Sequence, residues 1–195
     1  MTETTVTATG MNPAELTTDS SVGRLVFGTS ARLVDPATGL DVPTDPSAMG
    51  EFWVRGPNIM KGYWRNPAAT AATHTPDGWL KTGDMARVDA DGRWFIVDRL
   101  KEMIKVRGFQ VAPAELEGLL LGHEKVADAA VVGVVVDGEE APRAYVVLKP
   151  GVQATEREVA AWIEGQTTRY KWLTAGVVFV DAIPKNPVSS STLRR

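Results

Sequence analysis

The chain contains no cysteine and only two histidines among its 195 residues. Disulfides and thiolate metal sites are therefore excluded, and no metal-ligand spacing links His74 to His123. The formal net charge is only −3, which argues against bulk binding of nucleic acid. The longest apolar run covers residues 129–136, which is too short to cross a bilayer and fits a buried strand.

Targeting signals are also scarce. The first Lys or Arg is Arg24, so no basic segment opens a secretory signal peptide. The final residues are Leu-Arg-Arg rather than a Ser-Lys-Leu-type peroxisomal signal, which favours a cytoplasmic over a peroxisomal location. Apolar residues make up 44% of the chain and charged residues 23%, a balance typical of a packed domain.

The first half of the chain has the pattern of an antiparallel β unit. Residues 1–21 read as loop, and short strands are expected at 24–27, 31–34, 51–55, 85–89 and 93–97. Asn66-Pro67 is a helix-opening pair before residues 68–73, and Asp91-Gly92 is a hairpin signal.

The second half of the chain has a pattern of alternating helices and strands. We expect a helix at 113–121, a buried strand at 126–136, a solvated acidic turn at 137–140 and a strand at 143–148. Thr155 begins a capping-box signature for a helix to about residue 168, and a last strand follows at 176–180. The sequence thus predicts an α+β protein: a loop over 1–21, a β-barrel-like subdomain over 22–99 and a small α+β domain over 100–195.

A charge-dense segment joins the two halves. It holds Asp98, Arg99, Lys101, Glu102, Lys105 and Arg107, followed by Gly108. Cations around a glycine suit an anionic ligand, because each side chain can pair with phosphate and glycine admits a close backbone. The alternative is a solvated hairpin edge whose charges prevent aggregation.

Four blocks in a fixed order carry a family resemblance. They are Met1-Thr2-Glu3, residues 50–64, residues 77–84 with Thr-Gly-Asp at the end, and residues 92–117. In this order the whole chain resembles the C-terminal portion of the AMP-forming acyl- and aryl-CoA ligases, with 4-coumarate-CoA ligases and beetle luciferases as near relatives. The resemblance implies a β-barrel-like subdomain followed by a mobile α+β C-terminal domain.

The resemblance also implies a reaction. In the family a carboxylic acid attacks the α-phosphate of ATP, giving an acyl-adenylate and pyrophosphate, and coenzyme A then displaces AMP to form a thioester. Charge builds on phosphate oxygens in both steps, so ATP, AMP, Mg²⁺ and coenzyme A are the implied ligands.

Matching positions give the implied nucleotide site. Thr2 would bind a phosphate and Glu3 would hold Mg²⁺, the alternative being a frayed terminus. Asp84 would accept both ribose hydroxyls and Arg99 would contact the ribose; the alternatives are a turn aspartate and a strand-end ion pair.

The implied thioester-side residues follow. Leu100 and Lys101 lie at the family's hinge, with Lys101 near phosphate. Lys105 would act on the acyl-adenylate in the thioester step, and Gln110 would contact AMP or the acyl group. Arg107 and Gly108 would border the coenzyme A channel. The alternative for the lysines is plain surface solvation.

Two departures from the family pattern limit the expected activity. The 195 residues contain no Gly/Ser/Thr-rich phosphate loop ending in Pro-Lys and no acyl pocket, and Ser191 occupies the position expected for the adenylating lysine, with Lys185 at a different motif position. We therefore expect a truncated or split ligase that is inactive alone.

Three other expectations follow. Association with a ligase N-terminal domain, or self-association through an exposed apolar patch, is expected. One alternative is a non-enzymatic or vestigial partner of a full-length ligase. A peptide-synthetase adenylation fragment is disfavoured by residues 109–115.

Overall fold

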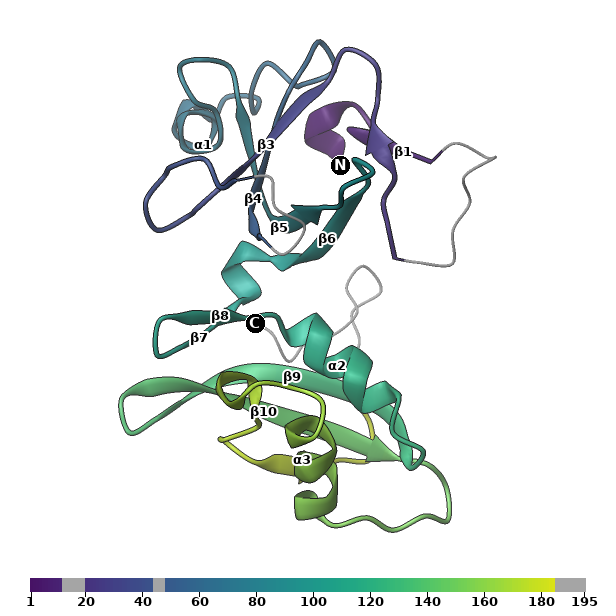
Figure 1. Cartoon of the computed structure of the whole chain (residues 1–195). Coiled ribbons are helices and arrows are strands. Elements are labelled where there is room, and N and C mark those ends of the chain that lie inside the picture. The colour runs from purple at the N-terminus through teal and green to yellow at the C-terminus, as the bar shows by residue number, and fades with distance from the viewer. Residues whose placement is uncertain (12–19, 44–47, 185–195) are drawn as a thin grey trace. The chain divides into compact units, whose positions relative to one another are not determined.

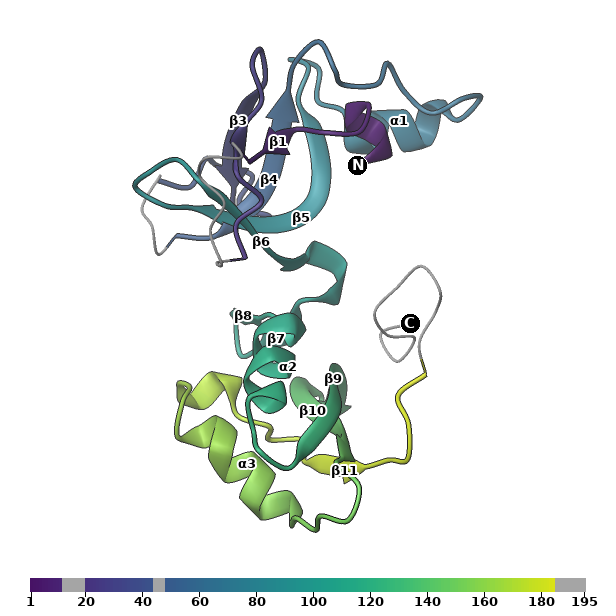
Figure 2. The same ribbon diagram turned by 90° about the vertical axis from the view of Figure 1, so that its right-hand side faces the viewer.

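A computed structural model describes residues 1–11, 20–43 and 48–184. The chain divides into two compact units, Met1–Leu100 and a second that begins at Lys101. Figures 1 and 2 show strands and short helices in both units, which confirms the predicted α+β class.

The first unit is built on a four-stranded antiparallel sheet. Its order is β3-β4-β5-β6, formed by β3 (Ser30–Val34), β4 (Gly50–Arg55), β5 (Leu80–Val88) and β6 (Trp94–Arg99). Leu33, Phe52, Val54, Leu80 and Trp94 form a buried cluster on one face. The antiparallel β unit expected from the sequence is therefore confirmed, with β5 beginning five residues before the expected strand.

Helix α1 (Pro67–Thr73) begins as the sequence predicts. Pro67 fills its first turn, and the Asn66 side chain accepts a hydrogen bond from the Ala69 N–H at 3.0 Å.

The prediction that residues 1–21 form a loop is wrong in part. The structure has a 3₁₀ turn η1 (Thr2–Thr4) and a short strand β1 (Thr9–Gly10), which pairs with β2 (Arg24–Leu25). Two-residue strands are too short to show an alternating apolar pattern, so the sequence did not predict this pair. Phe27, expected in the strand over 24–27, lies beyond the end of β2 and is fully exposed.

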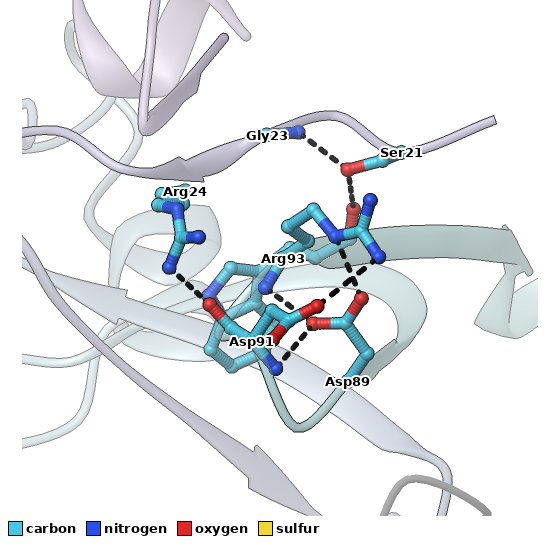
Figure 3. Close-up of polar contacts among 7 residues, drawn as sticks. Ser21, Gly23, Arg24, Asp89, Asp91 and Arg93 are labelled. Carbon is cyan, nitrogen blue, oxygen red and sulfur yellow. Dashed lines mark hydrogen bonds and ion pairs between the residues drawn. The ribbon is translucent and has the colours of Figure 1, made fainter. Parts of the chain in front are cut away.

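The turn between β5 and β6 is organised by one carboxylate. Asp89 accepts hydrogen bonds from the Asp91 N–H at 3.0 Å, the Arg93 N–H at 2.8 Å and Arg93 Nε at 2.8 Å (Figure 3). Arg24 donates to the Asp91 carbonyl, and Ser21 Oγ accepts from the Gly23 N–H, so the segment before β3 is tied to this turn.

The second unit has a three-stranded sheet of order β11-β10-β9. Strands β9 (Val126–Val136) and β10 (Glu139–Leu148) are antiparallel, and β11 (Val177–Phe179) runs parallel to β10. Helices α2 (Pro113–Leu121) and α3 (Glu156–Glu164) lie on one face of this sheet (Figure 2). Their buried Leu116, Leu120, Val159 and Ile163 join the strands in a single core.

Three expectations for this unit need correction. Helix α3 ends at Glu164 rather than near residue 168, because Gly165 caps it and a 3₁₀ turn η4 (Arg169–Lys171) follows. Glu139 and Glu140 belong to β10 rather than to a solvated turn. A two-stranded hairpin of β7 (Ile104–Val106) and β8 (Phe109–Val111) was not expected, since three-residue strands give almost no alternation.

The Asp89 carboxylate generates a testable prediction. Burial alone raises the pKa of this carboxyl, but hydrogen bonds from Arg93 and Asp91 outweigh it and hold the pKa below its usual value. A lowered pKa in the fold stabilises the protein above the unfolded-state pKa of about 4, and this contribution is lost as the pH falls further. Asp89→Asn is therefore expected to lower the melting temperature at pH 7, and by a smaller amount as the pH falls below 4.

Asp91→Asn is the matched control for this measurement. The Asp91 carboxylate is mostly exposed and reaches Arg93 only at 3.5 Å, so its loss should leave thermal unfolding nearly unchanged. Equal melting temperatures for both variants at pH 7 would contradict the role given to Asp89.

Candidate functional site

The Asp84 carboxylate lies at an irregular point of β5. The register of the β4–β5 pair shifts between Glu51 and Trp53, and Gly83 takes a left-handed conformation with φ 71°. This backbone geometry favours glycine and turns the chain immediately before Asp84. Asp84 is only 9% exposed, yet it lines an open cavity of about 480 Å³.

Hydrogen bonds fix the residues around Asp84. Thr82 Oγ1 donates to the Phe52 carbonyl at 2.7 Å and accepts from the Asp84 N–H at 3.1 Å. Arg99 faces Asp84 across the β5–β6 ladder, and its Nη1 lies 3.1 Å from Asp84 Oδ1. The strand-end ion pair weighed for Arg99 is thus present, and it leaves the guanidinium half-exposed.

The environment of Asp84 disfavours its charge. Burial raises the pKa of the Asp84 carboxyl above its usual value, although Arg99 and Thr82 oppose the shift, and the negative charge of Glu3 adds to it. A carboxylate held where ionisation is unfavourable, at the wall of an open cavity, is typical of a site that receives a polar ligand.

The Glu3 carboxylate belongs to the same unit. It accepts a hydrogen bond from the Tyr63 hydroxyl at 3.1 Å, and the Glu3 carbonyl accepts from the Met60 N–H at 2.8 Å. Burial, together with this Glu3 contact, raises the pKa of Tyr63. Thr2 lies in the same 3₁₀ turn, and its carbonyl accepts from the Thr5 N–H. The structure thus brings Glu3, Asp84 and Arg99 together in one unit.

A second set of predicted residues lies on the β7–β8 hairpin. Lys105 and Gln110 are register partners, and Arg107 and Gly108 form the two-residue turn. The Lys105 N–H donates to Glu140 Oε2 at 2.7 Å, and Arg107 Nε lies 3.6 Å from Glu139 Oε2. Glu140, which was expected to be merely solvated, therefore holds this hairpin, whereas the Glu139 pair is exposed.

The hairpin turn is strained at Arg107. Its φ is 48° and that of Gly108 is 86°, the pair of positive values that a two-residue type I′ turn requires. Glycine and asparagine suit such positions, whereas arginine is disfavoured. A cavity of about 770 Å³ beside the turn is lined by Arg107, Glu139, Arg169 and Tyr170. A Cβ added to Gly108 would meet no atom within 4 Å, so the turn is open on that side.

Some predicted positions stand apart from these sets. Lys101 lies in the exposed 3₁₀ turn η3 (Leu100–Glu102), and its hinge role stays a prediction. Lys185 and Ser191 lie outside the described residues. Sequence reasoning missed Glu51, Tyr63 and Glu140; the first two were within the quoted block 50–64, but nothing local showed their long-range hydrogen bonds.

Two family models match this chain. Residues 1–64 match the family model of the AMP-binding enzymes, and residues 115–189 match that of the AMP-binding enzyme C-terminal domain. The chain belongs to the AMP-forming acyl-CoA ligases of the adenylate-forming superfamily. The family resemblance seen in the sequence is confirmed.

Plant proteins are among the similar relatives of this ligase-family chain. It is 49% identical over 177 residues to 4-coumarate–CoA ligase-like 4 of Oryza sativa subsp. japonica, covering 90% of this chain and 31% of the relative. It is 46% identical over 177 residues to peroxisomal OPC-8:0-CoA ligase 1 of Arabidopsis thaliana, covering 90% of this chain and 32% of the relative. The chain thus spans about a third of the length of the curated relatives it matches.

Solved structures of the family agree with the fold. ATP-bound MatB from Rhodopseudomonas palustris matches 93% of this chain and 36% of its own, with a TM-score of 0.83 and 34% identity. The O-succinylbenzoate coenzyme A synthetase of Bacillus subtilis in complex with AMP matches 98% of this chain and 38% of its own, with a TM-score of 0.82 and 31% identity. No helix among the described residues is long and apolar enough to cross a membrane.

The raised pKa of Asp84 predicts a trade-off between stability and binding. A carboxyl whose pKa is raised in the fold contributes stability at low pH and loses it as the pH rises through the folded pKa. Asp84→Asn should therefore raise stability at pH 7, on the order of 1 kcal/mol or roughly 2–4 °C in melting temperature. At pH 3 the difference should vanish, because the wild-type carboxyl is then neutral. Scanning calorimetry at both pH values tests this, and a variant less stable than wild type at pH 7 would contradict it.

The strained turn generates a second prediction. Arg107→Asn places a residue that tolerates positive φ in the first turn position, so stability should rise by about 0.5–1 kcal/mol. The lost ion pair with Glu139 is exposed on both sides and contributes little. Urea denaturation is the measurement, and Lys105→Asn, in the adjacent strand, is the control that should give no stabilisation.

Proposed function

We propose that this chain supplies the ribose-binding and thioester-forming residues of an AMP-forming acid–CoA ligase. The observation that carries the proposal is the Asp84 carboxylate, buried and unfavourably ionised at an open cavity, with one oxygen toward Arg99. A group that costs stability at a cavity wall is best explained by a ligand that uses it.

Asp84 fits the ribose of the nucleotide. A carboxylate has two acceptor oxygens, which suits the adjacent 2′- and 3′-hydroxyls of AMP. Arg99, half-exposed beside Asp84, contacts the ribose from the other side and keeps the carboxylate ionised when the ligand excludes water. Binding the ribose orients the α-phosphate, where the acid attacks and pyrophosphate leaves.

Glu3 and Thr2 form the phosphate side of the proposed site. Within the described residues no three His, Cys, Asp or Glu side chains gather around a possible metal position. Mg²⁺ commonly binds one or two carboxylates together with substrate phosphates, so Glu3 alone fits this role. When bound, Mg²⁺ would neutralise the charge on the departing pyrophosphate. Glu3 is positioned for this by its hydrogen bond from Tyr63.

The β7–β8 hairpin is proposed to serve the thioester step. Coenzyme A attacks the acyl carbon, AMP leaves, and charge must be stabilised on the acyl oxygen and the phosphate. Lys105 supplies a cation there, Gln110 beside it contacts AMP, and Arg107 and Gly108 border the thiol's path. The presence of an arginine in a strained turn supports a functional cation at that position. Lys101, at the proposed hinge, approaches phosphate.

A ligase N-terminal domain is the proposed partner. The 195 residues hold no Gly/Ser/Thr-rich phosphate loop, so this polypeptide by itself is proposed not to adenylate an acid. Several large apolar side chains of the first unit are strongly exposed, notably Phe27 at 105%, Trp64 at 86% and Val6 at 81%. Such residues are typical of a surface that another domain covers.

Binding and complementation test the proposal. Isothermal calorimetry should show AMP binding to the 195-residue protein, at least tenfold weaker for Asp84→Asn. ATP–pyrophosphate exchange should be absent for the protein alone. Mixing it with the separately expressed N-terminal domain of a 4-coumarate-CoA ligase should convert 4-coumaroyl-adenylate and coenzyme A to the thioester and AMP, and Lys105→Ala should abolish that gain.

Two results would contradict the proposal. Equal AMP affinity for wild type and Asp84→Asn would remove Asp84 from the ribose site. Binding of neither AMP nor coenzyme A, together with binding to a full-length ligase, would favour a regulatory partner without catalytic residues.

A further inference from the structure

A second carboxylate, Glu51, is buried near Asp84, and among residues 1–11, 20–43 and 48–184 it has no ion pair. Its residue is 7% exposed, and its two oxygens accept hydrogen bonds from two neutral donors. Oε2 accepts from Trp53 Nε1 at 2.7 Å, and Oε1 accepts from the Gly83 N–H at 3.1 Å. Burying a carboxylate costs free energy unless hydrogen bonds compensate for the lost hydration. Here both Glu51 oxygens accept a hydrogen bond.

Two cations from the neighbouring strands lie over the Trp53 ring. Arg32 and Lys81 are its register partners on β3 and β5, so the three residues form one row across the sheet. The Arg32 guanidinium lies 4.8 Å and Lys81 Nζ 5.1 Å from the ring centroid, which are cation–π distances. This row restricts rotation of the indole and so fixes the direction of the N–H that Glu51 accepts.

Glu51 in turn holds the peptide that precedes Asp84. Gly83 has positive φ, and a Cβ built on it would meet nothing within 4 Å, so side-chain packing does not fix this turn. The hydrogen bond from the Gly83 N–H to Glu51 and the bond from the Asp84 N–H to Thr82 are the contacts that define it. Glu51 therefore contacts the backbone immediately before the residue whose carboxylate faces Arg99.

We infer that Glu51 is a positioning residue for the ribose-binding Asp84, with Trp53 as its anchor. The inference rests on the proposed nucleotide site. A carboxylate is required rather than an amide, because both partners are N–H donors and only a carboxylate accepts at both oxygens. Glutamine would place an NH₂ group against one of the two donors and release either Gly83 or Trp53.

The test compares AMP with 2′,3′-dideoxy-AMP, which lacks both ribose hydroxyls. Calorimetric titration of the 195-residue protein should show that Glu51→Gln weakens AMP binding about 5–20-fold, the effect of one misplaced charge-assisted hydrogen bond. Binding of dideoxy-AMP should not change. In the Glu51→Gln/Asp84→Asn double variant, the loss for AMP should equal that of Asp84→Asn alone, since Glu51 acts through Asp84.

Controls separate positioning from a general loss of stability. Glu156→Gln, an exposed carboxylate on α3, should leave both affinities unchanged. A merely structural role for Glu51 would lower the melting temperature and weaken both nucleotides equally, which would overturn the inference. If Glu51→Gln does not fold, Trp53→Phe removes only the anchoring donor and should weaken AMP binding about 2–5-fold with dideoxy-AMP unchanged.

The outcomes also separate this inference from the proposed function. If wild type binds AMP more tightly than dideoxy-AMP and Glu51→Gln keeps that preference in full, the positioning role is wrong and the nucleotide site stands. If wild type does not distinguish the two nucleotides, the ribose site itself is wrong, and the role of Glu51 falls with it.

Discussion

The first unit depends on keeping a carboxylate out of water beside an open cavity. Asp84 loses hydration on folding and receives only partial compensation from Arg99. The irregular pairing of β4 and β5 makes this arrangement possible, because the shifted register lets Gly83 turn and Thr82 hold the backbone on either side. The buried apolar cluster of the first unit supplies the stability that the site lacks.

The second unit also contains a locally unfavourable feature, which here is a backbone conformation. Its hairpin places Arg107 in a conformation that suits glycine or asparagine, and Glu140 holds the hairpin from the neighbouring strand. Phe109 stacks on Tyr170 with ring centroids 4.4 Å apart, which fixes the hairpin's other strand. In both units, then, an unfavourable local feature carries the proposed ligand contacts while ordinary packing nearby compensates for it.

The sequence predicts a helix or strand well where residues at its ends mark its start and stop. Residues 113–121 and 126–136 were predicted with their observed bounds, because Pro113, Gly122 and a long apolar run mark them. The β7–β8 hairpin and the β1–β2 pair were missed, since strands of two or three residues leave no period to detect. Asp84 and Arg99 were found through a family motif. Glu51 was not, because its partner Gly83 lies 32 positions away and the link exists only after β4 and β5 pair.

Among the described strands, β11 is the one that runs parallel to its neighbour. A parallel neighbour cannot be reached by a tight turn, so the chain must first cross the sheet through α3 and η4. The β9–β10 ladder can form as a local hairpin, whereas β11 closes a long loop before it gains any pairing. During synthesis on the ribosome, the second unit would therefore complete its sheet only after Phe179 has left the exit tunnel, with one side of β10 unpaired until then.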